Sequence, residues 1–202
     1  MTKQQTNTIL FLGDSNSPLL HWLEEREDKV IQTSDKITAD FIKTNNIQFI
    51  ISYCYQHIIK KDILNLLPNT TFNLHISLLP WNRGADPNLW SFIDNTPKGV
   101  TIHHIDEGVD TGDIIIQQQV TFTNKEETLA SSYQLLQQTI QRLFKQHWPS
   151  IKKGVGQRKA QFGKGTSHKV ADKAAILHLL TDGWNTPVTL LEGYSKNNKK
   201  VN

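Results

Sequence analysis

Asn73 and His75 form an Asn-x-His pair whose side chains could carry out a proton transfer next to a hydrogen-bond donor. The segment that holds them has the apolar character of a short strand, and residues two apart on a strand project to the same side. An amide and an imidazole would therefore face one space, and an imidazole accepts or releases a proton near neutral pH. An irregular loop follows at once, with an indole at Trp81 and a cation at Arg83. The pattern indicates a candidate catalytic pair, although a structural histidine would give the same pattern.

A second concentration of polar groups is the loop 105–113, which contains four acidic residues: Asp106, Glu107, Asp110 and Asp113. The spacing differs from the Asp-x-Asp-x-Asp-Gly pattern of a calcium loop, so the alternatives are a functional loop, a calcium site of another kind, or a solvated turn. The neighbouring pair His103-His104 could suggest a metal. Adjacent strand residues point to opposite faces, however, and no further ligand follows at metal spacing. We therefore expect no metal site.

The segment Gly13-Asp14-Ser15-Asn16-Ser17 comes directly after an apolar run and before a helical pattern. A loop between a strand and the N-terminus of a helix presents free backbone N–H groups, which suit an anion such as phosphate. The segment has one glycine instead of Gly-x-Gly-x-x-Gly, and it lacks the Gly-Lys-Ser/Thr of a P-loop. Taken alone, it is compatible with an ordinary turn as well as with a phosphate site.

These candidate groups need strands and helices to bring them together. Apolar runs predict strands at 8–13, 48–53, 72–75, 100–105 and 114–122. Helical spacing predicts helices at 19–23, 39–42, 58–67 and 87–93. Asp86 would cap the last of these, and Pro87 suits its first turn. Thr123 and Glu126 have the spacing of a capping box, which predicts a long helix that ends before Pro149.

The alternation of strands and helices favours a doubly wound, mainly parallel α/β sheet flanked by helices, in which functional groups gather at the carboxyl ends of the strands. The pattern weakens after Pro149, and the stretch 152–173 is rich in Gly, Lys and Gln. We expect a catalytic domain over residues 1–150. Over residues 151–202 we expect a helical or irregular C-terminal extension that packs on this domain or on a partner subunit.

The composition is that of a folded globular chain. Of the 202 residues, 37% are hydrophobic and 20% are charged, and apolar blocks recur throughout, which excludes disorder. No apolar run approaches the roughly 18 residues of a membrane span, and the first apolar run is too short for a signal peptide. The single cysteine, Cys54, cannot form an intrachain disulfide. We expect a cytoplasmic protein without a membrane partner.

The charge of the chain is divided unevenly. Residues 1–120 carry nine Lys and Arg against 14 Asp and Glu, whereas residues 121–202 carry 13 against five. A basic segment can bind nucleic acid or phosphate. It can equally be a solvated surface, because its lysines are scattered and not clustered with aromatic residues. A non-catalytic module that binds nucleic acid or a partner protein is therefore the rival hypothesis from another function class.

Four segments in this order resemble the formyltransferases that use N10-formyltetrahydrofolate: Asn73-Leu74-His75-Ile76-Ser77-Leu78-Leu79-Pro80, Arg83-Gly84, Gly99-Val100-Thr101-Ile102-His103 and Asp110-Thr111-Gly112-Asp113-Ile114. The family includes glycinamide ribonucleotide and methionyl-tRNA formyltransferases and the N-formyltransferases of nucleotide-linked amino sugars. The stretch 80–88 and the segment Gly165-Thr166-Ser167-His168 are most similar to the sugar branch, with Ser167 where a tyrosine is expected. The resemblance implies the formyltransferase fold.

The resemblance implies catalytic roles for three residues. His75 matches the histidine that would take the proton as the acceptor amine attacks the formyl carbon, or pass it to the leaving folate nitrogen. Asn73 matches the asparagine whose N–H would stabilise the oxyanion. Asp110 matches the aspartate that holds the histidine and favours its imidazolium form. No covalent enzyme intermediate is implied, since the folate already carries an activated formyl group.

The resemblance also implies two binding regions. The folate would contact Gln56, His57, Ile58 and Ile59, the loop formed by Ser77, Leu78, Leu79 and Pro80, and the loop formed by Asp106, Glu107 and Gly108. The acceptor and its phosphates would contact Gly13, Asp14, Ser15 and Asn16, together with Trp81 and Arg83.

We therefore expect formyl transfer from N10-formyltetrahydrofolate to the primary amine of a dTDP- or GDP-linked 4-amino-4,6-dideoxysugar, as in lipopolysaccharide O-antigen biosynthesis, without a metal or nucleic acid. The closest enzymatic rival is glycinamide ribonucleotide formylation. Methionyl-tRNA is disfavoured because those enzymes carry an added C-terminal barrel domain, for which the chain is too short. The helix over 128–148 and Trp184 suggest a homodimer, although a core-facing stripe explains that helix as well.

Overall fold

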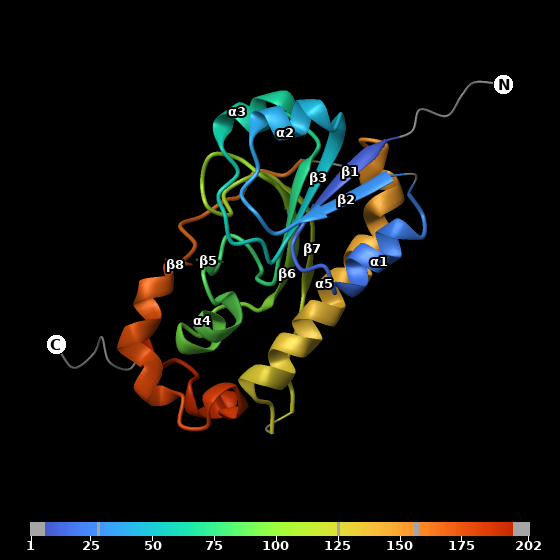
Figure 1. The fold of residues 1–202 in the computed structure, drawn as a ribbon. Helices are drawn as coiled ribbons and strands as arrows, with labels where there is room; N and C mark the ends of the chain where they lie inside the picture. The colour runs from blue at the N-terminus through green and yellow to red at the C-terminus, as the bar shows by residue number, and fades with distance from the viewer. Residues whose placement is uncertain (1–6, 28, 125, 156–157, 196–202) are drawn as a thin grey trace.

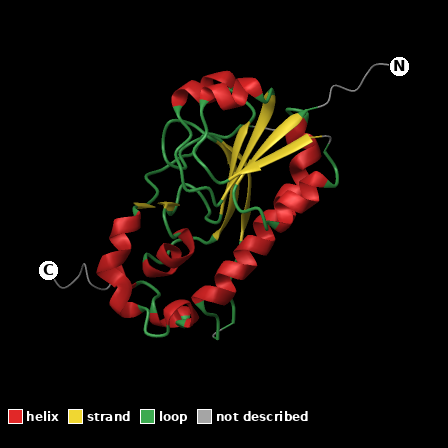
Figure 2. Cartoon of the chain, in the orientation of Figure 1, coloured by secondary structure: helices red, strands yellow, loops and turns green. Residues whose placement is uncertain are grey.

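A computed structural model describes residues 7–27, 29–124, 126–155 and 158–195 of the chain. Its centre is a six-stranded sheet with helices against both faces (Figures 1 and 2). The strands are β1 (Thr8–Leu12), β2 (Lys29–Thr33), β3 (Ile47–Tyr53), β4 (Thr71–His75), β6 (Gly99–His104) and β7 (Ile114–Gln119). Their spatial order is β2-β1-β3-β4-β6-β7. Strands β2, β1, β3 and β4 pair in parallel, whereas β6 pairs antiparallel with both β4 and β7. This arrangement confirms the predicted mainly parallel α/β sheet.

The α-helices of the described residues are α1 (Pro18–Glu24), α2 (Ala39–Thr44), α3 (Lys61–Leu66), α4 (Pro87–Ile93) and α5 (Leu129–Lys152). Helices α2 and α3 cover one face of the sheet, whereas α1 and α5 cover the other (Figure 1). On β1, Ile9 and Phe11 pack on the α1 and α5 side, and Leu10 and Leu12 pack on the α2 and α3 side. A strand buried on both faces needs an apolar residue at every position, which explains the continuous apolar run.

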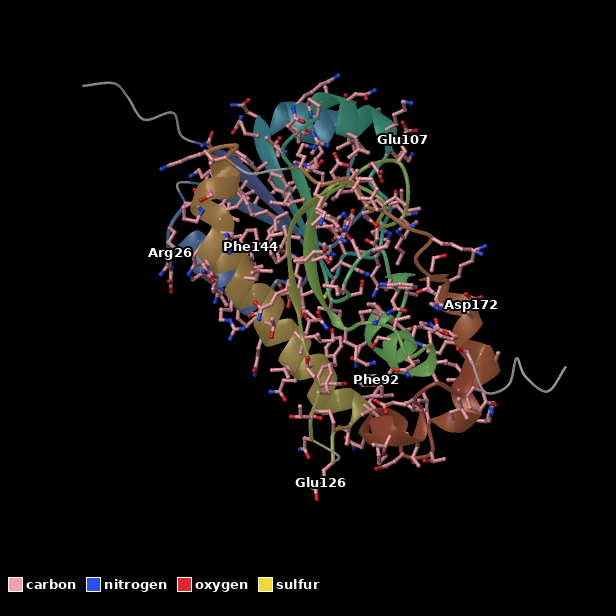
Figure 3. All side chains as sticks on the ribbon, turned by 180° about the vertical axis from the view of Figure 1, so that it is seen from behind. Arg26, Phe92, Glu107, Glu126, Phe144 and Asp172 are labelled. Carbon is pink, nitrogen blue, oxygen red and sulfur yellow. The ribbon has the colours of Figure 1, made fainter. Side chains whose placement is uncertain are left out.

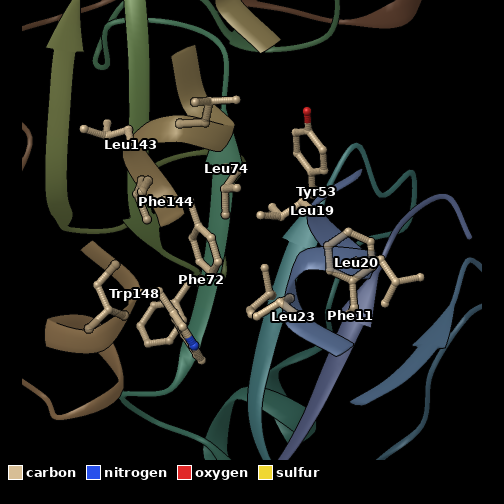
Figure 4. Packing of buried hydrophobic residues seen from close by; sticks show 14 of the residues in the cluster. Phe11, Leu19, Leu20, Leu23, Tyr53, Phe72, Leu74, Leu143, Phe144 and Trp148 are labelled. Atoms are coloured by element: carbon tan, nitrogen blue, oxygen red, sulfur yellow. The ribbon is translucent and has the colours of Figure 1, made fainter. Parts of the chain in front are cut away.

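Aromatic side chains fill the core between the sheet and α5 (Figure 4). Phe144 stacks on Trp148 with ring centroids 5.2 Å apart, and Phe49 meets the same indole edge-on at 5.6 Å. The indole N–H of Trp148 donates to Glu27 at 2.7 Å, so the buried ring leaves no unpaired donor. The apolar stripe of α5 therefore faces the core, and a homodimer stays a prediction.

The start of α5 differs from the predicted one. The amide of Ser131 donates to the hydroxyl of Thr128, and the amide of Thr128 donates to the hydroxyl of Ser131. This reciprocal cap satisfies two free amides at the helix start. The prediction that Thr123 and Glu126 form the capping box was wrong, because the Glu126 amide bonds to the side chain of Asn124 in the preceding turn.

The prediction that this helix ends before Pro149 was also wrong, because α5 continues to Lys152. A proline near the end of a helix removes only one backbone hydrogen bond there. Trp148 and Ile151 are both buried, and their packing in the core holds the last turn in place. The predicted domain boundary at residue 150 falls inside this turn and stays a prediction.

Two other elements differ from the sequence prediction. Strand β2 was not predicted, because its residues Lys29–Thr33 are partly polar and lie at the edge of the sheet, where burial is incomplete. The helix predicted over 58–67 is shorter in the structure, where it is α3 and begins only at Lys61. Ile59 turns into the core beside Ile63 before the helix starts, whereas Ile58 is exposed.

The described part of the C-terminal extension returns to the loop after β4. Strand β8 (Ser167–His168) pairs with β5 (Arg83–Gly84) in a separate two-stranded sheet. Three 3-10 helices follow: η1 (Val170–Leu179), η2 (Gly183–Asn185) and η3 (Val188–Leu190). Side chains of η1 and η3 pack with α4, as the orange and red segment beside it in Figure 1 shows. Some residues of the two predicted domains lie outside the described residues: 1–6 of the catalytic domain, and 156–157 and 196–202 of the extension.

Within the described ranges, no helix has the length and apolar character that a membrane span requires.

Candidate active site

The carboxyl end of β4 carries Asn73 and His75, as the strand prediction required. Strand β6 runs antiparallel beside it and places His103 opposite Asn73. The loop after β6 returns Asp110 to the same point, where its carboxylate lies near both imidazoles. We call these four residues the His–Asp cluster. They come from two adjacent strands and one loop, so only the folded sheet brings them together.

His75 is oriented by its two ring nitrogens. Nε2 lies 2.9 Å from the backbone oxygen of Asn82, and a carbonyl only accepts, so Nε2 carries the hydrogen of the neutral ring. Nδ1 is then the basic atom, and it lies 3.5 Å from Oδ2 of Asp110. In this tautomer Nδ1 and the carboxylate oxygen are both acceptors, so no hydrogen bond joins them and the Nδ1 lone pair can take a proton. The imidazolium that results would face a carboxylate.

Asn73 and His103 complete the cluster. Nδ2 of Asn73 donates to Oδ1 of Asp110 at 3.0 Å and lies 3.2 Å from Nε2 of His103. Nδ1 of the buried His103 donates to the backbone oxygen of His104 at 2.7 Å, which leaves Nε2 of the neutral ring as an acceptor. Sequence reasoning did not place His103 in the site. Its position opposite Asn73 could have identified His103, but that position depends on the antiparallel pairing of β4 and β6.

Asp110 is a buried carboxylate that lies beside two histidines and accepts hydrogen bonds from Asn73 and Gly84. Burial raises its pKa, but His75, His103 and the N–H of Gly84 outweigh burial and hold the pKa of this carboxyl well below its usual range. The Gly84 amide donates to Oδ2 at 2.8 Å. Asp110 therefore remains charged at neutral pH.

The segment that orients His75 is itself fixed from two sides. Asn82 is fully buried, and its Nδ2 donates to Oγ1 of Thr96 at 2.7 Å. Its backbone amide donates to Oγ1 of Thr166 at 2.8 Å, and Thr166 returns a hydrogen bond to Oδ1 of Asn82 at 3.0 Å. Sequence reasoning missed Asn82 as a site residue. Its carbonyl, and not its side chain, contacts His75, and a sequence pattern rarely reports a backbone contact.

Arg83 lies beside the cluster and is paired within the protein. Its Nε and Nη2 donate to Oε1 of Gln161 at 3.0 and 2.7 Å. Asp86, the acid three residues further along, pairs instead with Lys173 at 3.0 Å. Asp86 lies at the N-cap position of α4, as predicted, but it makes no side-chain cap. Contacts of Arg83 or of the half-buried Trp81 with an acceptor stay predictions.

The loop predicted to bind the acceptor opens onto a cavity of about 740 Å³ at the carboxyl ends of β1, β2 and β3. The cavity is lined by Gly13, Asp14, Ser15, Gln32, Thr33, Ser34, Asp35, Cys54, Tyr55, Gln56 and His57. The structure therefore brings the predicted acceptor loop next to the start of the predicted folate segment. Asn16 is exposed and donates to Asp14. A Cβ at Gly13 would lie 2.3 Å from the backbone oxygen of Tyr53, so only glycine fits there.

The loop 106–108, predicted to bind folate, contacts the chain just after the predicted folate segment 56–59. Lys61, at the start of α3, forms an ion pair with Glu107 at 2.7 Å. Glu107 is labelled in Figure 3, where its loop passes close to the start of α3. Oδ1 of Asp106 accepts hydrogen bonds from the Gly108 amide and the Thr111 hydroxyl, which order this loop. The loop therefore connects the predicted folate region to Asp110.

The third predicted folate segment, residues 77–80, is mostly turned inward. Ser77 and Leu79 are buried, and the Leu79 amide donates to Oγ1 of Thr101 at 3.2 Å. The side chains of Leu78 and Pro80 are partly exposed. These two residues are the parts of the segment that a ligand could contact.

His104 points away from the cluster, as the alternation along β6 predicted, and lies against Phe72 with ring centroids 5.3 Å apart. Burial lowers the pKa of His104 to about 4, assisted by the positive charge of Arg158. Among the described residues, no group of three or more His, Cys, Asp or Glu side chains is placed to hold a metal ion.

Comparison with solved structures finds other proteins with the same fold. The formyltransferase PseJ from Anoxybacillus kamchatkensis, in complex with UDP-4,6-dideoxy-4-formamido-L-AltNAc and tetrahydrofolate, is 49% identical and has a TM-score of 0.89. The match covers 94% of this chain and 100% of that one. A sugar N-formyltransferase from Shewanella sp FDAARGOS_354 shares the fold, with a TM-score of 0.75, 22% identity and coverage of 92% and 87% of the two chains.

Curated sequence relatives include methionyl-tRNA formyltransferases. The enzyme of Thermodesulfovibrio yellowstonii is 35% identical over 133 residues, which is 62% of this chain and 41% of that protein. The enzyme of Clostridioides difficile is 40% identical over 91 residues, 45% of this chain and 29% of that protein. The chain thus spans less than half the length of these relatives. A family model described as formyl transferase matches residues 12–146, a range that contains the whole His–Asp cluster, and the chain therefore belongs to the formyl transferase family.

Proposed function

We propose that this protein transfers a formyl group from N10-formyltetrahydrofolate to the 4-amine of a nucleotide-linked 4-amino-4,6-dideoxysugar. The observation that carries the proposal is the buried cluster in which Nδ1 of His75 faces the carboxylate of Asp110. The full-length similarity to PseJ supports the substrate class. A 4-formamido sugar nucleotide and tetrahydrofolate, bound together in that crystal, are the two products of such a transfer.

We propose uridine diphosphate as the nucleotide carrier. The sequence led us to expect dTDP or GDP, which are the other carriers to test. The relative that is 49% identical over its whole chain holds a UDP-linked sugar, and this similarity favours uridine. The use of the product in O-antigen biosynthesis stays a prediction.

In the proposed reaction, the amine nitrogen bonds to the formyl carbon, and the bond from that carbon to N10 of the folate breaks. Nδ1 of His75 takes the proton that the amine loses, and the same atom returns it to the leaving nitrogen. Asp110 stabilises the imidazolium between these two steps. The hydrogen bond from Nε2 to Asn82 keeps the ring in one orientation throughout.

Asn73 would stabilise the formyl oxygen as it gains negative charge. Both N–H groups of the amide are directed within the cluster, one toward the carboxylate of Asp110 and one toward the neutral ring of His103. The contact with the carboxylate is the shorter and is charge-assisted, so it is the stronger. The N–H that faces His103 therefore makes the weaker contact, and we propose that it donates to the reacting oxygen, while the other keeps Asn73 in place.

The residues present fit a folate ligand. The ion pair between Lys61 and Glu107 joins the loop 106–108 to the chain two residues after the segment 56–59. That loop leads directly into Asp110, so a ligand held between the segments would have one end at the His–Asp cluster. The exposed side chain of Ile58 offers an apolar surface, and backbone groups of both segments offer hydrogen bonds. The folate supplies an activated formyl group on a nitrogen that can leave.

The cavity beside Gly13 is the proposed site for part of the acceptor. Asp14 and Asp35 line it, and none of the described residues in its lining is Lys or Arg. Two carboxylates favour hydroxyl or amine groups over phosphate oxygens, because a carboxylate only accepts hydrogen bonds. We therefore propose that residues 13–16 contact the sugar or ribose part of the acceptor.

The test is an incubation of the protein with N10-formyltetrahydrofolate and single acceptors. The panel contains UDP-, dTDP- and GDP-linked 4-amino-4,6-dideoxysugars, glycinamide ribonucleotide and methionyl-tRNA. We expect the UDP-linked sugar to gain the mass of one formyl group, with tetrahydrofolate released in equal amount. Formylation of glycinamide ribonucleotide or methionyl-tRNA, with every sugar unchanged, would overturn the proposal. Binding of nucleic acid that weakens steeply with salt, without formyl transfer, would favour the binding-module hypothesis.

A further inference from the structure

Gln161 comes from the C-terminal segment and lies between two parts of the site. Its Oε1 accepts from Nε and Nη2 of Arg83 at 3.0 and 2.7 Å. Its Nε2 donates to the backbone oxygens of Asp110 and Gly112 at 2.8 Å each. The amide thus uses both of its N–H donors and accepts two hydrogen bonds, which holds the side chain in one orientation.

These hydrogen bonds belong to a closed network that links Asp110, Gln161 and strand β5. Gln161 binds the backbone oxygen of Asp110 on one side and the guanidinium of Arg83 on the other. The residue after Arg83, Gly84, donates its amide hydrogen to the carboxylate of Asp110. The main chain and the carboxylate of Asp110 are therefore both tied to strand β5, by separate routes. Two attachments of this kind fix the rotation of the side chain as well as its place.

We infer that Gln161 is a positioning residue, which sets the direction and distance of the Asp110 carboxylate toward His75. The inference rests on the proposed function, in which Asp110 stabilises the protonated His75. Asp110 has a left-handed backbone, with φ of 53°, and its Oδ2 lies 3.5 Å from Nδ1 of His75. Small shifts of a catalytic group are costly, and a misplacement of about 1 Å can slow a reaction about 100-fold. The hydrogen bond from Gln161, which lies outside the loop, keeps the Asp110 carboxylate from shifting by such a distance.

Two variants of Gln161 and one control separate the possible roles. Gln161→Met keeps the approximate length of the side chain and removes all of its hydrogen bonds. Gln161→Glu keeps the acceptor contacts with Arg83, now charge-assisted, but it places an oxygen against the backbone oxygens of Asp110 and Gly112. Arg158→Met is the matched control, because Arg158 anchors the same segment to the same loop through Asp113, at 3.1 Å.

Both Gln161 variants are expected to lose about 10- to 100-fold in kcat, the range found when partners that orient metal-binding side chains are removed. The KM for formyl-folate should change much less, because Gln161 binds Arg83 and the main chain of Asp110 and Gly112, and none of the predicted folate segments. Arg158→Met should retain the wild-type kcat. A wild-type kcat in Gln161→Glu, a rise in KM alone, or an equal loss in Arg158→Met would each overturn the inference. If Gln161→Met does not fold, Gln161→Glu decides the question.

Hydrogen exchange of the Gly84 amide tests the same inference without a substrate. This amide donates to Oδ2 of Asp110, so a displaced carboxylate should leave it less protected. We expect exchange to become at least about tenfold faster in both Gln161 variants, and to be unchanged in Arg158→Met. Unchanged exchange in both Gln161 variants would overturn the inference. If the wild-type protein formylates none of the acceptors, the proposed function fails, and the exchange rates still decide the role of Gln161.

Discussion

Nδ1 of His75 lies 3.5 Å from Oδ2 of Asp110, and one short segment anchors both side chains. Asn82 accepts a hydrogen bond from Nε2 of His75, and Gly84 donates one to Oδ2 of Asp110. The separation of the base and the carboxylate therefore depends on the segment 82–84. Because β5 pairs with β8, a part of the chain far along the sequence also contributes to this separation.

Substitution of the Asn-x-His pair should abolish most turnover while the fold remains. His75→Asn removes the proton-accepting atom and should slow the reaction about 100- to 10,000-fold. Asn73→Ala removes the donor for the reacting oxygen and should cost about 100- to 1000-fold. Steady-state kinetics on each variant, with circular dichroism to confirm folding, provides the measurement. A rate close to the wild type in either variant would remove that residue from the proposed centre.

Asp110→Asn should slow turnover strongly and weaken folate binding less, because the charge acts on His75 during proton transfer. A neutral amide cannot stabilise the imidazolium, and its NH2 group would face the donors that now bind the carboxylate. The kcat and the Kd for formyl-folate, measured on the same variant, check the prediction. An unchanged pH dependence of kcat would exclude an electrostatic role for this carboxylate.

Asp110 should also make the stability of the protein depend on pH. Its pKa in the folded state is lower than in the unfolded chain, so the carboxylate stabilises the fold above the unfolded value, about 3.9. This contribution is lost as the pH falls below that value toward the folded pKa. Urea unfolding of the wild type and Asp110→Asn should show a difference in free energy that is largest at neutral pH and shrinks in acid. A difference that does not change with pH would contradict the prediction.

His103→Leu should reduce both activity and stability. The substitution leaves the backbone oxygen of His104 and one N–H of Asn73 without their present partner, and an unpaired buried group costs about 1–3 kcal/mol. The freed amide of Asn73 would also be less well oriented for the reacting oxygen. Thermal unfolding and kcat are the measurements. His104→Leu is the control, since that ring points away from the cluster, and it should keep the wild-type kcat.

The contact between Trp90 and His168 should support the site from a distance. The two rings are stacked with centroids 3.8 Å apart and an angle of 3°, and Nε2 of His168 lies 2.8 Å from Oδ2 of Asp94. An aromatic pair contributes about 0.5–1.5 kcal/mol beyond its buried area. We expect His168→Ala to lower the melting temperature and kcat together, because β8 holds β5. His168→Phe, which keeps a ring on Trp90, should recover part of both, and recovery of neither would count against the stack.

The sequence alone determined which residues are candidates for catalysis and that the chain forms a mainly parallel α/β sheet. Strands such as β1 are buried on both faces, so their apolar runs are visible without a structure. The Asn-x-His pair and the acidic loop are local patterns, and the order of the segments carried the family resemblance. These features depend on residue type and near spacing, which a sequence displays directly.

Only the tertiary structure decided how the candidates meet. His103 joins the cluster because β6 pairs antiparallel with β4 in one register, and Asn82 contributes through its backbone. Gln161 reaches Asp110 because the C-terminal segment folds back over the loop. The end of α5 beyond Pro149 follows from burial of side chains and not from local preference. Contacts between distant segments and backbone groups are set by packing and strand register, which no local pattern of residues contains.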